Sequence, residues 1–184
     1  MFQSLEGKLL LAMPAMRDPR FVKSVIYLCS HSEEGAMGIA INHRIENLSF
    51  SQLLKQLQIR TKTIRDIPIH AGGPVEAGRG FVLHSSDFAQ ASTMKVSPLI
   101  HLSATVDILK SLAEGSGPKH HLLALGYAGW GKGQLERELA RNSWLTVDAE
   151  NEVIFETPME EKWTRAMACI GVDVNMLSGD AGHA

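Results

Sequence analysis

The amino-acid sequence predicts an α+β fold. Apolar segments of strand length occur in pairs around short turns, amphipathic helices carry capping signals, and strands and helices do not alternate regularly. The length of 184 residues, with 45% hydrophobic and 21% charged residues, is typical of one globular domain with a substantial core. We therefore expect a single domain that spans residues 1–184, without a linker or an internal repeat.

Three strands are predicted near the N-terminus. Lys8–Pro14 is an apolar run that ends at its proline, and Val22–Cys29 is a second run rich in β-branched and aromatic residues. Ala36–Ile41 returns from a turn at Ser32–Gly35. The second and third segments are therefore expected to form a hairpin.

A capping box predicts a helix that begins after Ser49. The Ser49 side chain can accept a hydrogen bond from the main chain three residues later, and the Gln52 side chain can return the contact. Apolar residues at helical spacing follow and predict a buried stripe on this helix. They are Phe50, Leu53, Leu54 and Leu57.

The middle of the chain is predicted to hold three extended segments and a helix. The segments are Ile67–His70, Gly80–His84 and Val96–Leu102, with a tight turn at Gly72–Pro74. The helix is expected to begin after a cap at Ser103 and to stop at Gly115 and Pro118. Its expected inward residues are Val106, Leu109, Leu112 and Ala113.

Four glycines within eight residues follow a short apolar strand at Leu122–Leu125. We expect Gly126–Gly133 to form a glycine-rich loop, because such clusters mark positive φ angles or close approach of the main chain to a neighbour. Leu135 and Leu139, four residues apart, predict a short helix after it. No phosphate-binding motif fits, since the residue after Lys132 is not the Ser or Thr that a Walker A loop requires.

The C-terminal part is predicted to form a hairpin and a helix. Trp144–Val147 and Val153–Phe155 flank a polar turn, as the strands of a hairpin do. Thr157 and Pro158 predict the start of the last helix. Its expected buried face consists of Trp163, Ala166, Met167 and Ile170. The residues after Leu177 are expected to fray.

The charge and the cysteine content narrow the function classes. A formal net charge of −2 with scattered Lys and Arg argues against non-specific nucleic-acid binding, which depends on clustered cations. Cys29 and Cys169 show no C-x-x-C spacing, which is typical of free thiols in a reducing cytosol. The N-terminus does not resemble a signal peptide, and no apolar stretch approaches the ~20 residues that span a bilayer. We expect a soluble cytoplasmic protein without membrane contact.

The glycine segment supplies the main candidate binding site. Tyr127, Gly129, Trp130, Gly131 and Lys132 are placed to line a pocket for a small or anionic ligand at the start of the following helix. The alternative is a tight packing corner in which the two aromatic side chains fill the core. Glycine clusters more often serve backbone geometry, so this alternative is favoured.

Other residues with functional chemistry each have a simpler interpretation. Asp18 and Arg79 are candidate ligand-binding residues in one crevice, although an ion pair that supports loops is simpler. Cys29 is a candidate reactive thiol because it shares a strand face with His31 by the two-residue period, but the apolar run before it favours an inert, buried thiol. His84 lies beside two serines and an aspartate, yet sequence neighbours do not make a catalytic triad. The eight histidines lack metal-binding spacing, so we expect neither a metal nor a cofactor.

Eight segments spread over nearly the whole chain carry a resemblance to a known family. They are Gly7–Pro14, Asp18–Phe21, Ser24–His31, Gly35–Gly38 with Ile41–Asn42, Gly72–Val75, Arg79–His84, Leu125–Glu136 and Ala181–Ala184. Together they resemble the AlgH/YqgE family of bacterial proteins. The resemblance implies a branched mixed β-sheet that curls into a pseudo-barrel and is flanked by helices. It implies no agreed catalytic or ligand-binding residues, and it brings a transcriptional-regulator label that derives from a genetic link to alginate production.

Three functions remain open on the sequence. The first is a non-enzymatic cytoplasmic binding or regulatory protein that acts through an unknown protein or small-molecule partner. It is favoured because no catalytic constellation or cofactor motif is complete. The second is a small-ligand or redox enzyme that uses the Gly126–Gly133 loop or Cys29. The third is nucleic-acid binding, against which the near-neutral charge counts.

Overall fold

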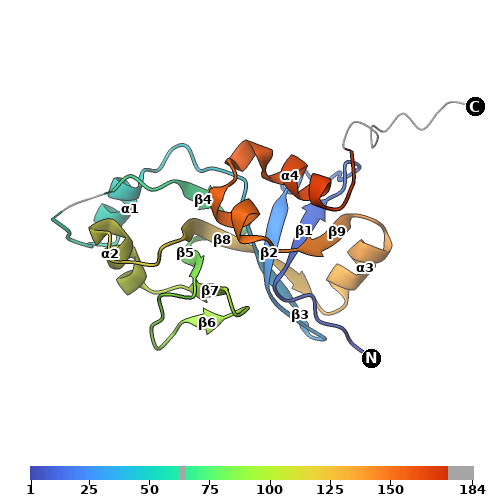
Figure 1. The fold of residues 1–184 in the computed structure, drawn as a ribbon, viewed down its shortest axis with the longest axis horizontal. Helices are drawn as coiled ribbons and strands as arrows, with labels where there is room; N and C mark the ends of the chain where they lie inside the picture. The colour runs from blue at the N-terminus through green and yellow to red at the C-terminus, as the bar shows by residue number, and fades with distance from the viewer. Residues whose placement is uncertain (63–64, 174–184) are drawn as a thin grey trace, which may run out of the picture.

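Apolar segments separated by turns pair into one mixed β-sheet in the computed structural model, which describes residues 1–62 and 65–173 (Figure 1). The strands are β1 (Lys8–Ala12), β2 (Val25–Ser32), β3 (Gly35–Ala40), β4 (Ile69–Ala71), β5 (Val75–Ser85), β6 (Met94–Lys95), β7 (Ile100–Ser103), β8 (His121–Gly131) and β9 (Trp144–Asp148). The helices are α1 (Phe50–Gln56), α2 (Val106–Glu114), α3 (Gln134–Ala140), a π-helical turn η1 (Glu152–Glu156), a 3-10 turn η2 (Met159–Glu161) and α4 (Lys162–Cys169).

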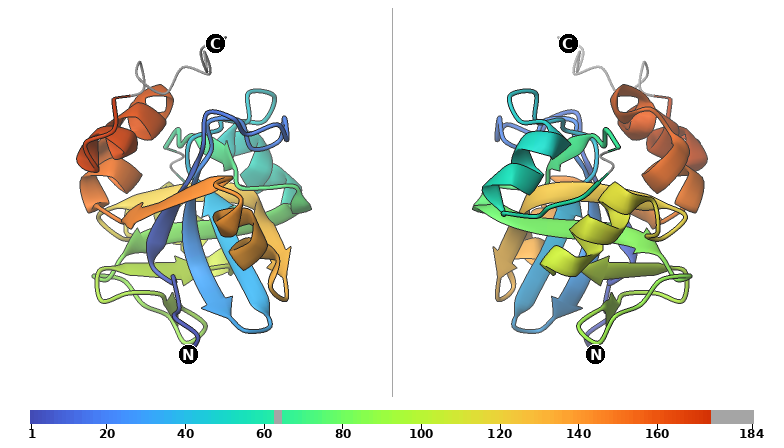
Figure 2. Two further views of the ribbon diagram at one scale, coloured as in Figure 1. Left: turned by 90° about the vertical axis from the view of Figure 1, so that its right-hand side faces the viewer. Right: turned by 90° about the vertical axis from the view of Figure 1, so that its left-hand side faces the viewer.

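Strand β8 joins the two halves of the sheet. The strand order is β6-β7-β5-β8-β3-β2-β1-β9 with antiparallel neighbours, and β4 pairs with β8 in parallel outside this path. The sheet therefore branches at β8, and it curls into a half-barrel with α1 and α2 at one end and α3 at the other (Figure 1). Figure 2 shows β2 and β3 running across the direction of β5 and β7. The α+β fold and the branched, curled mixed sheet expected from the sequence are confirmed.

A bend at Gly126 lets β8 serve both halves. Before the bend, Leu123–Leu125 pairs with both β4 and β5, and after it Ala128–Gly131 pairs with β3. Gly126 has a φ of +75°, a left-handed conformation that residues with a β-carbon rarely adopt. The turn before β5 packs against this bend, where the Gly72 amide donates to the Leu125 carbonyl at 2.7 Å. The bend thus depends on glycine at this position.

Buried apolar side chains form three clusters on the faces of this sheet. The largest lies inside the curl and includes Tyr27 and Phe81. A second lies beneath α1 and α2 and is centred on Phe50. The third packs α3 against the outer face of β1 and β2 through Leu135 and Trp130. Each face of the sheet is therefore covered, as a two-sided apolar sheet requires.

Helix α1 forms where the capping box predicts it. The Ser49 hydroxyl accepts from the Gln52 amide at 3.2 Å, and Gln52 Oε1 accepts from the Ser49 amide at 2.9 Å. The predicted burial of Leu57 was wrong, because the helix ends just before it and its side chain is 41% exposed. Ile170 is likewise 41% exposed at the C-cap of α4, where a buried residue was expected. Local hydrogen bonds set the start of α1, whereas Leu57 and Ile170 are exposed because each lies at the C-cap, after the last helical residue.

The prediction that Gly126–Gly133 forms a loop was wrong. Strand β8 continues through Gly131, and only Lys132 and Gly133 turn before α3. Pairing with β3 supplies main-chain partners as far as Gly131, so an extended strand is stable there. Gly126 and Gly133 have positive φ angles, whereas Gly129 lies in the extended strand.

Two predictions about α2 were also wrong. Ser103 ends β7 instead of capping the helix, and its hydroxyl lies 2.8 Å from His84 Nε2. Thr105 takes the N-cap position without a side-chain hydrogen bond. Val106 is 50% exposed, and Ile108 takes the buried place that Val106 was expected to fill. The hydrogen bond to a buried histidine holds Ser103 in the sheet.

The predicted C-terminal hairpin does not form. Val153–Phe155 lies in the π-helical turn η1, and β9 pairs with β1 instead. The last helix, α4, begins at Lys162 after η2, later than the start predicted at Thr157. The family-like tail Ala181–Ala184 and the expected fraying after Leu177 lie outside the described residues.

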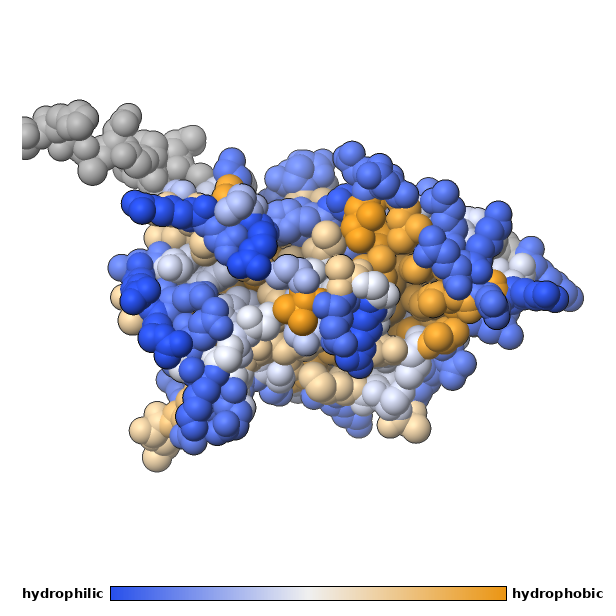
Figure 3. Space-filling model, turned by 180° about the vertical axis from the view of Figure 1, so that it is seen from behind, coloured by the Kyte–Doolittle hydropathy of each residue, from blue (hydrophilic) through white to orange (hydrophobic). Residues whose placement is uncertain are grey.

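Across the described part of the chain, none of the helices combines the length and the apolar character needed to cross a membrane. Apolar side chains do gather on the surface over α1 and α2 (Figure 3). Leu57 and Val106 are exposed there and line a small groove above β5.

Candidate functional site

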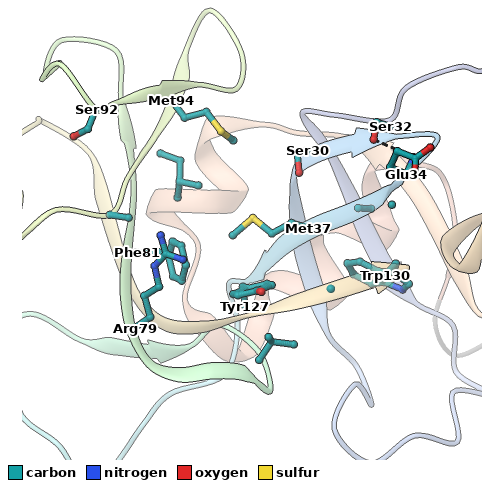
Figure 4. Close-up of a pocket in the computed structure, with 16 residues that line it drawn as sticks. Ser30, Ser32, Glu34, Met37, Arg79, Phe81, Ser92, Met94, Tyr127 and Trp130 are labelled. Atoms are coloured by element: carbon teal, nitrogen blue, oxygen red, sulfur yellow. Dashed lines mark hydrogen bonds between the residues drawn. The ribbon is translucent and has the colours of Figure 1, made fainter. Parts of the chain in front are cut away.

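A cleft of about 800 Å³ opens at the mouth of the half-barrel. It lies between the β2–β3 hairpin and the end of β8 on one side, and β5, β6 and the end of β7 on the other. Met37, Arg79, Phe81, Met94 and Tyr127 extend toward this space from four different strands (Figure 4). The volume falls in the range of ordinary small-molecule sites.

An irregular stretch of β5 places Arg79 at the rim of the cleft. Val75 pairs with Tyr127, but the next pair is Gly80 with Leu125, so β5 advances five residues while β8 advances two. The extra residues stand out of the sheet as an enlarged bulge, a device that commonly redirects side chains beside binding sites. The Arg79 guanidinium then lies 5.1 Å from the centre of the Phe81 ring.

The charge on Arg79 is only weakly compensated. Its Nη1 lies 3.4 Å from Glu76 Oε2, and both side chains are more than half exposed. An ion pair of this kind contributes little free energy because water screens it. Arg79 is therefore a cation at the rim of an apolar cleft, available to an anionic group.

The floor of the cleft is apolar and adaptable. Phe81 and Tyr127 meet edge to face with ring centres 5.8 Å apart. Met37 and Met94 supply two flexible thioether side chains, and Met94 is 39% exposed. Methionine and aromatic surfaces of this kind accommodate apolar ligands of varied shape.

A carboxylate behind the cleft holds two tryptophans in place. Glu138 Oε2 accepts hydrogen bonds from Trp130 Nε1 at 2.9 Å and from Trp144 Nε1 at 2.8 Å. Gln134 Nε2 donates to the other carboxylate oxygen at 3.0 Å. The Trp130 indole thus forms a rigid wall between the cleft and a second cavity of about 730 Å³.

Four of the predicted site residues meet in the cleft, and the others do not. Arg79, Tyr127, Gly129 and Trp130 line it. Gly131 and Lys132 lie beyond its edge, where Lys132 Nζ is 3.3 Å from the rim residue Glu34. The structure brings these positions together because β8 is one continuous strand, which the sequence did not predict. Their role in binding stays a prediction.

Asp18 lies apart from Arg79, beside the second cavity. Its carboxylate accepts two-point hydrogen bonds from Arg20, with Arg20 Nη2 at 2.7 Å from Oδ2. These hydrogen bonds lower the pKa of Asp18. Asp18 is thus engaged within its own loop, and the shared crevice considered for Asp18 and Arg79 does not form.

Cys29 and His31 do not share a face, contrary to the sequence prediction. A β-bulge between Leu28 and Ser30 breaks the two-residue alternation of β2. Cys29 is fully buried in the cluster inside the curl, and burial raises the pKa of its thiol. His31 instead contacts α3, with Nε2 2.7 Å from Glu136 Oε1. Cys29 lacks the exposed, thiolate-stabilising environment of a reactive cysteine.

His84 belongs to a buried polar network and forms no catalytic triad with its sequence neighbours. Its Nδ1 lies 2.9 Å from the Ser85 carbonyl, which orients the ring, and its Nε2 contacts the Ser103 hydroxyl. Asp87 instead accepts hydrogen bonds from the Ser85 hydroxyl and the Lys119 amide. Within residues 1–62 and 65–173, no group of three or more His, Cys, Asp or Glu side chains is arranged to hold a metal ion.

Sequence reasoning missed several residues of the cleft. Met37, Phe81 and Met94 line it with apolar side chains. Met37 and Phe81 were assigned only to strands, and Met94 was assigned to no element. A signal existed for Met37, since it lies among small residues at Gly35–Gly38 that leave space around a long side chain. Met94 carried no such signal, because β6 reaches the cleft only through its pairing with β7.

Comparisons with known proteins identify close relatives. The family model DUF179, described as AlgH-like, matches residues 9–175. A UPF0301 protein of Bradyrhizobium diazoefficiens is 52% identical over 189 residues, covering 98% of this chain and 88% of the relative. A UPF0301 protein of Rhodospirillum rubrum is 51% identical over 181 residues, covering 98% of this chain and 94% of the relative.

Two solved structures share the fold. The AlgH protein from Pseudomonas aeruginosa superimposes with a TM-score of 0.81 at 41% identity, covering 100% of both chains. A protein from Corynebacterium diphtheriae superimposes with a TM-score of 0.76 over 97% of this chain and 93% of its own. Its identity is 17%, so this second likeness concerns the fold alone.

Proposed function

This chain belongs to the AlgH-like family, and from that premise we propose that it is a ligand-binding protein without catalysis of its own. The proposed ligand is a small molecule with an apolar body and a carboxylate, held in the cleft at the mouth of the half-barrel. The observation that carries the proposal is the position of Arg79, a weakly paired cation beside Phe81 at the rim of an apolar cleft.

The composition of the cleft supports binding over chemistry. Among the described residues that line it, none is a histidine, cysteine or lysine. The acidic residue at the rim, Glu34, is exposed and paired with Lys132, so it lacks the apolar environment that tunes a general acid or base. The apolar floor and one guanidinium are instead the usual composition of a site that selects an amphiphilic anion.

A regulatory role would follow from this binding. The two halves of the sheet meet at the cleft, so a ligand that contacts both Met37 and Met94 would stabilise one spacing between them. We propose that a partner protein recognises the sheet in this spacing. Nucleic acid fits less well, because the cleft presents a single arginine where a phosphate backbone would need several cations.

The test compares pairs of ligands that differ only in charge. Octanoate with octanol, and 3-phenylpropanoate with 3-phenylpropanol, are titrated while Tm and tryptophan fluorescence are recorded. The carboxylates are expected to raise Tm and to change the emission of Trp130, which lines the cleft. Arg79→Gln is expected to weaken carboxylate binding about tenfold and to leave the alcohols unchanged, because a charged hydrogen bond is lost.

Arg165→Gln is the matched control. Arg165 is also half-exposed and is also paired with one glutamate, Glu152, but it does not line the cleft. The control variant should bind the carboxylates as the wild type does. Absence of a Tm shift with either carboxylate up to its solubility limit, or an equal loss in both variants, would refute the proposal.

A further inference from the structure

A lysine is buried in a separate cavity, away from the cleft. Lys162, the first residue of α4, is 3% exposed. Its Nζ donates to the Ile154 carbonyl in η1 at 2.7 Å and to the Ile41 carbonyl after β3 at 2.9 Å. Among the described residues, no carboxylate forms an ion pair with Lys162 within 4.0 Å. A buried ammonium without a carboxylate is costly, so burial shifts the equilibrium of Lys162 toward the neutral amine.

Burial lowers the pKa of Lys162 to about 8. A neutral amine has two hydrogens and one lone pair. The two carbonyl partners account for both hydrogens, since a carbonyl oxygen can only accept. The lone pair is then the remaining function of Nζ, and an amine in this state is a nucleophile near neutral pH.

The cavity beside Lys162 has a volume of about 260 Å³. Part of its lining is apolar, and His70, His121, Thr157 and Lys162 supply the polar part. The apolar residues include Leu122, Leu123, Ile154, Phe155 and Met159. The described residues that line it include no acidic side chain. Its contents are therefore expected to be small and uncharged, with an apolar part and a polar group.

A neutral imidazole lines the same cavity. His70 is 6% exposed, and its Nδ1 lies 3.0 Å from the Leu123 carbonyl. Because that carbonyl accepts the hydrogen bond, Nδ1 carries the proton and Nε2 keeps its lone pair. Burial and the nearby Lys162 charge lower the pKa of His70 to about 4. His70 is thus a base beside an amine, and Thr157 adds a hydroxyl to the lining.

We infer that Lys162 is a covalent capture site for a small aldehyde or ketone, with His70 as its proton acceptor. The Nζ lone pair attacks the carbonyl carbon, the nitrogen then gives one proton to His70, and the carbonyl oxygen takes up a proton to give a carbinolamine. Loss of the hydroxyl group as water then forms the C=N bond of an imine. Both hydrogens of the amine leave with that water, so the step needs no oxidant or reductant.

Imine formation also has a structural consequence. The neutral imine has no N–H and its protonated form has one, so Nζ can remain bonded to at most one of its two carbonyl partners. The Ile154 carbonyl belongs to a π-helical turn, an element that is frequent at functional sites. Capture of a carbonyl compound would therefore break the hydrogen bond of Nζ to the Ile154 carbonyl in η1 or to the Ile41 carbonyl after β3.

The test measures reductive alkylation site by site in the wild-type protein. Native protein is incubated at pH 7 with butanal and limiting cyanoborohydride, and peptide mass mapping follows Lys162 and the exposed residue Lys110. Lys162 is expected to react at least about tenfold faster than Lys110, since a lower pKa leaves more free amine. In urea the two rates should converge, because the cavity is lost.

Two variants separate capture from a purely structural role. His70→Gln should slow modification of Lys162 and leave the Lys110 rate unchanged, and Lys162→Met should remove the fast site. Circular dichroism checks that both variants fold. If Lys162 in native wild type is modified no faster than Lys110, its role is only to hydrogen-bond the two carbonyls, and the inference is overturned. This outcome is independent of ligand binding in the cleft.

Discussion

The main chains of Gly73 and Gly126 cross with almost no space between them. A β-carbon on Gly73 would lie 2.1 Å from the carbonyl carbon of Tyr127, and one on Gly126 would lie 2.4 Å from the Gly73 carbonyl oxygen. Both glycines also have positive φ angles, +154° and +75°. This crossing holds the bend of β8, and the bend places the second half of the strand at the cleft.

Gly126→Ala is expected to destabilise the protein by about 3 kcal/mol or more. The substitution combines a left-handed backbone with a clash against main-chain atoms that cannot move aside. Urea unfolding measures the effect. Gly131→Ala is the control on the same strand, since its β-carbon would meet nothing closer than 3.9 Å. Equal losses in the two variants would contradict the crossing as the cause.

Glu138→Ala is expected to lower the free energy of unfolding by about 2–4 kcal/mol. It removes the shared acceptor of Trp130 and Trp144 and leaves two indole N–H groups without their partner. Urea unfolding gives the loss, and tryptophan fluorescence should change in the folded state. Glu136→Ala, on the same helix, removes one contact to His31 and should cost clearly less. The prediction fails if the emission spectrum of Glu138→Ala matches that of the wild type.

Native protein is expected to show one fast thiol. Cys169 is exposed, whereas Cys29 is fully buried with a raised pKa. A thiol reagent such as DTNB should react with one equivalent quickly and with the second only on unfolding. Cys169→Ser should abolish the fast phase, and Cys29→Ser should leave it intact. Rapid labelling of Cys29 in native protein would restore the redox hypothesis.

The free energy of unfolding is expected to fall as the pH drops from 6.5 through 4. Burial, reinforced by the charge of Lys162, lowers the pKa of His70 from 6.5 to about 4, so the unfolded chain binds a proton in this range before the folded one does. The part of the unfolding free energy that depends on neutral His70 is therefore fully present above pH 6.5 and is lost as the pH falls toward 4. The contribution of His70 is about 3 kcal/mol at most.

His70→Asn isolates this contribution, since its amide can still donate to the Leu123 carbonyl. Buried His84 and half-buried His121 also have lowered pKa values, so the variant should keep part of the pH dependence. Urea unfolding between pH 4 and 7 measures the difference between the two profiles. Parallel profiles would show that His70 does not titrate as expected.

Several elements were predictable because their hydrogen bonds join near neighbours in the chain. The Ser49–Gln52 capping box started α1, and Gly115 ended α2 with a φ of +76°. The β2–β3 hairpin also followed from a short turn between two apolar runs. Each of these features needs only a few consecutive residues, so the local pattern decides it.

The sequence by itself determined the family, the α+β class, the start of α1, the end of α2 and the β2–β3 hairpin. Only the tertiary structure decided that β8 runs on to Gly131, because β3 supplies the pairing partners. It also decided that Val153–Phe155 lies in a π-helical turn, where the Ile154 carbonyl accepts a hydrogen bond from Lys162. The tertiary structure also decided the cleft, since its lining residues come from six strands, β2, β3, β5, β6, β7 and β8, in different parts of the chain. Contacts between distant segments carry the free energy that overrides local preference, and no local pattern encodes which segments will meet.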